Sequence, residues 1–155
     1  MTELVASYNN TPIKTQDELE ALLDEVAAQT PPSWLELVLA PVKESPFENT
    51  VLNIGLGRTF SSMSFYNWGS DGDGSRYDTA GTLDTPREAD FDYGGTPTSM
   101  QPGSAIEVEQ ARAAVAEFLR TGKRPEAVTW TLFDQAHKEP EPFNDADWEE
   151  FDPEA

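Results

Sequence analysis

The chain of 155 residues contains no cysteine, and its only histidine is His137. The lack of cysteine excludes disulfide bonds, thiolate metal sites and cysteine nucleophiles. The lone histidine has no apparent local partner for a catalytic triad, and beside an acidic segment we expect a solvated imidazole. The sequence also lacks the phosphate-loop, dinucleotide-binding, α/β-hydrolase and H-E-x-x-H motifs, and the H-x-E and P-C-x-x-C motifs of zinc deaminases. We therefore expect no catalytic residues, no metal ion and no cofactor.

Long apolar stretches are missing as well. The first ten residues do not combine a basic segment with an apolar one, so the sequence predicts no secretory signal. The longest apolar run, from Trp34 to Val42, is interrupted by Glu36 and is far too short to cross a membrane. Together with the lack of cysteine, these features predict a soluble, cytoplasmic protein with no membrane partner.

Positive charge is scarce: 10 lysines and arginines face 29 aspartates and glutamates, which gives a net charge of −19. Recognition of phosphates requires a basic surface, so direct binding of nucleic acid is not expected. Such a charge instead steers association with a positively charged surface. The composition favours a binding protein with a basic partner. The alternative is general acidity for solubility or a salt-rich cytoplasm, which predicts folding that improves in molar salt and no tight partner.

Two helices are predicted. Thr15 and Glu18 form a capping box, which is typical of a helix start, and Pro31 and Pro32 end the element because neither can donate a backbone hydrogen bond. Gly122 and Pro125 mark the end of the second helix. Each helix has one apolar stripe at helical spacing, formed by Leu19, Leu22, Leu23 and Val26 in the first and by Ala111, Ala114, Val115, Phe118 and Leu119 in the second.

Several short strands surround these helices. Apolar or alternating segments predict strands at residues 4–8, 34–39, 50–57, 59–68, 75–80 and 128–133, with a weaker signal at 91–93. The turn-forming residues 69–74 predict a hairpin, whereas residues 81–103 are either a long functional loop or irregular edge structure. Trp34 and Trp130 lie in apolar runs and are expected in the core. The fold class is therefore α+β, a mainly antiparallel sheet with two helices packed against it.

The composition changes at Asp134. Residues 134–155 contain nine acids and one lysine, a net charge of −8, with three interleaved aromatic residues, Phe143, Trp148 and Phe151. We divide the chain into one α+β domain at 1–133 and an acidic C-terminal tail at 134–155. The aromatic residues are expected to anchor this tail to its own domain or to a partner.

The segment from Glu109 to Trp130 resembles a recurring C-terminal block. Its matching positions are Ala111-Arg112, Phe118-Leu119, Thr121-Gly122, Arg124-Pro125 and Trp130, and an earlier W-x-x-D-G-D hairpin is formed by Trp68, Asp71, Gly72 and Asp73. The block is similar to that of immunity proteins of bacterial polymorphic toxin systems, in the family found beside DddA-like deaminase toxins. This resemblance implies an α+β fold and a non-enzymatic protein that neutralises a cognate toxin. Structural roles are expected for Phe118, Leu119, Gly122, Arg124, Pro125 and Trp130.

Candidate interface residues follow from charge and expected exposure. Acids would meet the arginines and lysines of a toxin, and aromatic residues would bury as anchors, although ordinary strand packing explains any single aromatic equally well. The main group comprises Trp68, Asp71, Asp73, Tyr77, Asp90, Asp92 and Tyr93. The second group lies in the tail and comprises Asp145, Asp147, Trp148 and Glu149.

Two other functions stay open. The same acidity suits a nuclease or another basic toxin as the target, and a small carboxylate-dependent hydrolase or cation-binding protein is a different class. The segment that begins at Asp71 starts like a calcium loop, but its sixth and twelfth positions are Arg76 and Thr82 rather than glycine and glutamate. A hairpin turn is therefore the favoured interpretation of this segment.

Overall fold

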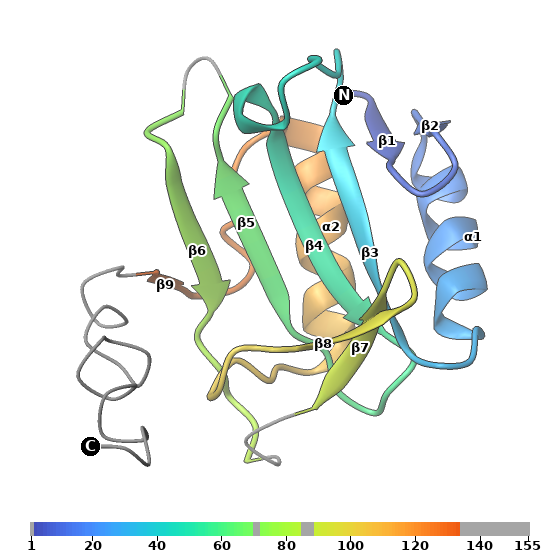
Figure 1. The fold of residues 1–155 in the computed structure, drawn as a ribbon, viewed down its shortest axis with the longest axis vertical. Coiled ribbons are helices and arrows are strands. Elements are labelled where there is room, and N and C mark those ends of the chain that lie inside the picture. The colour runs from blue at the N-terminus through green and yellow to red at the C-terminus, as the bar shows by residue number, and fades with distance from the viewer. Residues whose placement is uncertain (1, 70–71, 85–88, 134–155) are drawn as a thin grey trace, which may run out of the picture.

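The computed structural model describes residues 2–69, 72–84 and 89–133, in which nine strands form one sheet accompanied by two α-helices (Figure 1). The strands are β1 Leu4–Ala6, β2 Thr11–Ile13, β3 Ser33–Leu39, β4 Thr50–Leu56, β5 Met63–Asn67, β6 Ser75–Thr79, β7 Asp90–Tyr93, β8 Thr96–Ser99 and β9 Trp130–Leu132. The helices are α1 Gln16–Ala27 and α2 Val108–Thr121, with a short 3-10 helix at Pro46–Glu48. The predicted tail at 134–155 lies outside the described residues.

The sheet is antiparallel along its main path, in the order β2-β1-β3-β4-β5-β6-β9. The hairpin of β7 and β8 branches from this path, because β7 pairs in parallel with β3 only at Ser33 and Asp92. The predicted α+β class, a mainly antiparallel sheet with two helices, is confirmed.

Both helices begin or end where the sequence predicts. The Thr15 hydroxyl accepts the Glu18 N–H at 3.1 Å, and the Glu18 carboxylate accepts the Thr15 N–H at 3.2 Å, so the capping box is complete. Gly122 ends α2 in the left-handed conformation at φ 71°, where its N–H donates to the Phe118 carbonyl at 2.8 Å. Glycine adopts this conformation without steric cost, so it suits this position.

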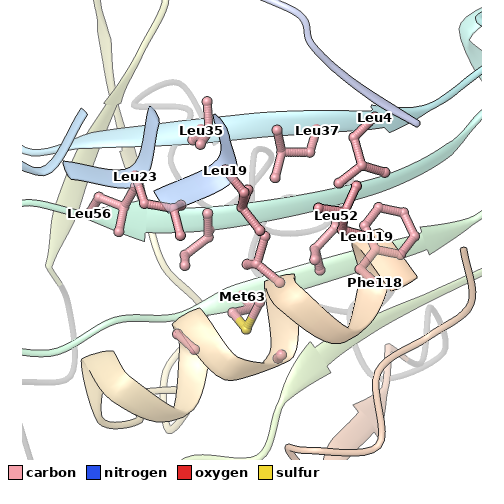
Figure 2. Close-up of a cluster of buried hydrophobic side chains, with 14 of the residues drawn as sticks. Leu4, Leu19, Leu23, Leu35, Leu37, Leu52, Leu56, Met63, Phe118 and Leu119 are labelled. Carbon is pink, nitrogen blue, oxygen red and sulfur yellow. The ribbon is translucent and has the colours of Figure 1, made fainter. Parts of the chain in front are cut away.

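The two helices cover one face of the sheet and build the main core there. Figure 2 shows this cluster, in which sheet residues such as Leu35 and Leu52 meet Leu23 of α1 and Phe118 of α2. The rings of Phe65 and Phe118 pack edge to face with centroids 5.7 Å apart. Every second residue of β3, β4 and β5 is therefore buried against the helices, while the residues between them point to the opposite face.

A second, smaller core lies on that opposite face. In Figure 1 the β7–β8 hairpin crosses one end of the sheet on the side away from α2. Phe91 of β7 is fully buried beside Trp34 and Phe60, and the indole N–H of Trp34 donates to the Thr98 carbonyl at 3.1 Å. These contacts of Phe91 and Trp34 hold the hairpin against one end of the sheet, and the rest of this face stays uncovered. We call the uncovered part the open face.

The observed strands differ from the predicted segments in where one strand begins and in the presence of two further strands. The segment 59–68 forms a strand only from Met63, because Ser61 instead makes an isolated bridge to Ile106. Strands β2 and β8 were not predicted, since each is short and contains a proline, Pro12 or Pro97, which is tolerated at sheet edges. Of the two tryptophans expected in the core, Trp130 is partly buried against the main core, whereas Trp34 is partly buried against the smaller one, because its strand turns this side chain toward the β7–β8 hairpin.

Candidate functional site

A row of polar side chains crosses the open face. Glu36 of β3 pairs in register with Asn53 of β4, Asn53 pairs with Ser64 of β5, and Ser64 pairs with Asp78 of β6. Residues directly opposite one another on neighbouring strands point to the same face. The four side chains therefore form one line across four strands, on the face that no helix of the described residues covers.

Three residues of this row, Glu36, Asn53 and Ser64, line a groove with a volume of about 520 Å³, together with the neighbouring Val38 and Val51. Four aromatic side chains line it: Trp34, Tyr66, Trp68 and Tyr93. The ring centroids of Tyr66 and Trp68 lie 4.8 Å apart, and the ring of Phe47, which is 70% exposed, packs in a tilted geometry with its centroid 5.3 Å from that of Trp68. Aromatic walls over a polar floor are typical of surfaces that bind another molecule.

One carboxylate of the row is neutralised and the other is not. Asp78 accepts the Ser64 hydroxyl at 2.6 Å and forms an ion pair with Arg76 at 3.1 Å. Glu36 accepts the Ser7 hydroxyl at 2.7 Å and the Tyr93 hydroxyl at 3.5 Å, but it forms no ion pair with a described lysine or arginine. The groove therefore presents one uncompensated negative charge.

Beside Glu36, the carbonyl oxygen Oδ1 of Asn53 is buried and has no hydrogen-bond partner among the described residues. A buried acceptor without a donor is unfavourable in a folded protein, and such groups call for an explanation. Asn53 lines the groove, so rotation of its amide toward a bound molecule would give the orphan oxygen a donor.

The pKa values of the two tyrosines that line the groove, Tyr66 and Tyr93, are raised above the ordinary value. Burial raises the pKa of Tyr66, and the nearby Arg76 partly opposes this effect. Burial also raises the pKa of Tyr93, and the negative charge of Glu36 adds to the increase. Perturbed ionisable groups gather at functional sites, so the two shifts agree with the geometry in marking this groove.

Two of the predicted interface residues, Trp68 and Tyr93, line the groove. Asp73 instead lies in the β5–β6 turn, where its carboxylate accepts the Ser75 N–H at 2.9 Å and the Tyr77 hydroxyl at 3.2 Å. Tyr77 packs against the main core on the helix side of the sheet. Asp71, Asp145, Asp147, Trp148 and Glu149 lie outside the described residues.

The remaining predicted acids belong to the β7–β8 hairpin. Asp90 accepts the Ser99 hydroxyl at 2.7 Å, and Asp92 accepts the Gly95 N–H at 3.0 Å. Both carboxylates therefore support the hairpin itself, and Asp90 also stays exposed. The structure does not bring these acids into the floor of the groove.

The residues predicted to be structural occupy interior or packing positions. Phe118 and Leu119 are fully buried, and Gly122 ends α2. The guanidinium of Arg124 lies 4.0 Å from the centroid of the Tyr77 ring, while the Trp130 indole N–H donates to the Pro125 carbonyl at 2.7 Å. This block thus ties the end of α2 to strands β6 and β9.

The sequence analysis missed Glu36, Asn53 and Trp34 as groove residues. A signal was present in β3, since Glu36 interrupts an otherwise apolar strand and alternates with the buried Leu35 and Leu37. Asn53 gave a similar signal in β4. Only the strand pairing shows that the two polar residues lie side by side.

A second hollow of about 830 Å³ lies where the chain leaves α2, and Asn49 lines both this hollow and the groove. Its lining carries charges of both signs, among them Lys43, Lys123, Glu48 and Asp73. In the described ranges, no cluster of three or more histidine, aspartate or glutamate side chains could hold a metal ion. The groove on the open face is the stronger candidate site, because it combines the orphan acceptor with the unpaired carboxylate.

The fold and the groove define a class: an acidic α+β protein with an aromatic-lined binding surface on an open sheet. The model of the family described as "Immunity protein Imm1" matches residues 8–132, so the chain belongs to the Imm1 family of immunity proteins. A comparison with curated proteins found no match. Within the described part of the chain, neither helix combines the length and apolarity needed to span a membrane.

Proposed function

We propose that this chain is a non-enzymatic immunity protein that binds and neutralises a cognate toxin, and that the toxin is a DddA-like nucleic-acid cytosine deaminase. The observation that carries the proposal is the match to the Imm1 family over residues 8–132. The deaminase as target rests on the sequence resemblance of the block from Glu109 to Trp130. The protein would act in the cytoplasm, where a producing cell needs protection.

The charge of the chain supports this target. A deaminase acts on a base of a polyanionic strand, which it must hold in a positively charged channel. A protein with a net charge of −19 is attracted to such a channel and competes there with nucleic acid. A nuclease presents a similar basic surface, so a nuclease toxin is the alternative target.

We propose the groove on the open face as the surface that binds the toxin. Trp68 and Tyr93 supply aromatic contact area in the groove, and Asp90 and Asp92 add negative charge on the neighbouring hairpin. Protection against a lethal enzyme requires slow release of the toxin. We expect a nanomolar dissociation constant or better, over an interface of about 1,600 Å².

The experiment is a titration of the full chain against the toxin domain encoded beside its gene. Calorimetry measures the affinity, and the rate of cytosine deamination on single-stranded DNA measures inhibition. Stoichiometric loss of deamination with nanomolar affinity is the expected result. Tight binding to a toxin without deaminase activity would replace the target class, and no binding would overturn the immunity function.

A further inference from the structure

The most informative feature of the groove is the pair formed by Glu36 and Asn53. The two residues are directly opposite on β3 and β4, and the Cβ atoms of such pairs lie about 4.5–5.5 Å apart. The Glu36 carboxylate faces the groove without a cation of the described residues, and the buried Asn53 Oδ1 lacks a donor among them. The pair therefore requires a ligand with several hydrogen-bond donors and a positive charge.

One arrangement of this kind already exists at the edge of the groove, which Arg76 and Tyr66 line. The guanidinium of Arg76 binds the Asp78 carboxylate at 3.1 Å and lies over the rings of Tyr66 and Phe133, at 5.4 and 4.5 Å from their centroids. Here a carboxylate at one end of the polar row holds a guanidinium against aromatic rings. A guanidinium bound to a carboxylate and packed on aromatic rings is therefore compatible with this part of the protein.

The other end of the row repeats these elements without the guanidinium. Glu36 takes the place of Asp78, and Tyr93, whose hydroxyl reaches Glu36 at 3.5 Å, takes the place of Tyr66. Tyr93 is 47% exposed, so part of its surface is open to a partner. The orphan Oδ1 of Asn53 adds an acceptor that the Arg76 arrangement does not have.

We infer that the groove receives one arginine side chain of the toxin, whose guanidinium binds the Glu36 carboxylate beside Tyr93 and, once the Asn53 amide rotates toward the groove, Asn53 Oδ1. This inference rests on the proposed immunity function. A guanidinium has five donors in a planar fork and stacks on aromatic rings, so it can serve two acceptors on adjacent strands at once. A lysine ammonium is a compact point charge and lacks the planar surface for stacking.

Charge complementarity between the groove and the toxin indicates that the bound side chain belongs to the toxin. The groove carries the uncompensated charge of Glu36 in a chain with a net charge of −19, and the toxin surface that binds nucleic acid is rich in arginine and lysine. An arginine of that surface would bind the Glu36 carboxylate in place of a phosphate of the nucleic acid. Binding in the groove would then compete directly with the substrate of the toxin.

The first test compares E36Q and N53L with the wild-type chain in calorimetry and dissociation kinetics against the neighbouring toxin domain. E36Q should weaken the affinity about 30-fold or more, chiefly through faster dissociation, because it leaves a buried arginine without its charge partner. E126Q is the matched control, since it removes the same charge from an exposed loop residue that does not line the groove. It should change the affinity less than about threefold.

N53L separates binding from folding. Leucine removes the orphan acceptor, so the free variant should melt at a temperature equal to or above that of the wild type, while its affinity for the toxin falls. A residue needed only for the fold would show the opposite pattern. Wild-type affinity in both E36Q and N53L would overturn the inference and leave the immunity function intact. A wild-type chain that does not bind the toxin would instead remove the proposed function and the inference with it.

The second test identifies the toxin side chain. Each arginine and lysine of the toxin surface is replaced by alanine and combined with E36Q in a double-mutant cycle. One arginine should lose most of its effect in the E36Q background, because the two changes remove the same interaction. Coupling to a lysine, or to no residue of the toxin, would overturn the assignment of arginine.

Discussion

The ring of Phe91 lies directly against the backbone of Gly55: a Cβ atom at Gly55 would be 2.7 Å from Phe91 Cζ. The contact joins β7 to the middle of the sheet, and Phe91 is fully buried in it. Tyr93 follows on the same strand and reaches Glu36. The lack of a side chain at residue 55 therefore sets how closely the β7–β8 hairpin approaches the groove.

G55A should displace the hairpin and damage the groove. The added methyl group would overlap the Phe91 ring, which is enclosed by its neighbours, so we expect a loss of about 1–3 kcal/mol in the free energy of unfolding. The affinity for the toxin should also fall, because Tyr93 would move relative to Glu36. Chemical denaturation and calorimetry measure the two effects.

T15A is the control for stability alone. It removes the hydroxyl that caps α1 and should cost about 1 kcal/mol of stability. Helix α1 contacts the opposite face of the sheet, so the affinity for the toxin should stay at the wild-type value. Equal affinities of G55A and T15A would show that the position of the hairpin does not matter for binding.

Asp73 should make the β5–β6 turn sensitive to acid. The Ser75 N–H, with help from Asn67 and Tyr77, lowers the pKa of Asp73 below its ordinary value of 3.8. Because the pKa is lower in the folded state, the stabilisation is present above about pH 3.8 and is lost as the pH falls through the folded value. The melting temperature of D73N should therefore lie below that of the wild type at neutral pH, and the difference should shrink below pH 3.8.

D84N controls for the loss of one negative charge, since Asp84 lies on another exposed loop. Its melting temperature should follow the wild type at each pH. A difference between D73N and the wild type that persists at pH 2 would show that the turn does not depend on the charge of Asp73.

Arg124 should stabilise the end of α2 through its ring contact. R124A removes the guanidinium that lies 4.0 Å from the Tyr77 centroid, which should cost about 0.5–1 kcal/mol for an exposed residue. K123A removes the same charge from the neighbouring exposed position and should change stability by less than about 0.5 kcal/mol. Equal losses in the two variants, measured by urea denaturation, would assign the effect to net charge and not to the ring.

Salt should act on association more than on folding. Raising the salt concentration from about 0.05 to about 0.5 M shortens the screening length, so the association rate with the toxin should fall while the dissociation rate changes little. Stopped-flow fluorescence of the complex measures both rates. A melting temperature that keeps rising steeply into molar salt, with no tight partner, would favour the alternative of a salt-adapted protein.

Features that depend on local interactions could be predicted from the sequence, whereas features that depend on pairing between distant segments could not. Local signals were sufficient for α1 and α2, because a capping box and a left-handed glycine act within a few residues of the helix ends. Alternation likewise indicated a strand in the segment 59–68, where β5 forms from Met63 to Asn67. The short edge strands β2 and β8 escaped prediction, because their pairing partners and not their own residues make them strands.

The candidate site was predicted only in part for the same reason. Trp68 and Tyr93 were selected as exposed aromatic residues, and both line the groove. Asp73 was selected for its charge, but the structure shows that its carboxylate serves the turn. Local sequence does not reveal whether a carboxylate is already occupied by its own backbone.

The sequence by itself determined the α+β class, the two helices with the start of α1 and the end of α2, and the acidic character that suits a basic partner. Only the tertiary structure decided that Glu36 and Asn53, 17 positions apart in the chain, lie side by side, with the Tyr93 hydroxyl 3.5 Å from the Glu36 carboxylate. The physical reason is strand register: pairing between β3 and β4 aligns the two residues, and the close approach of Phe91 to Gly55 positions the hairpin beside them.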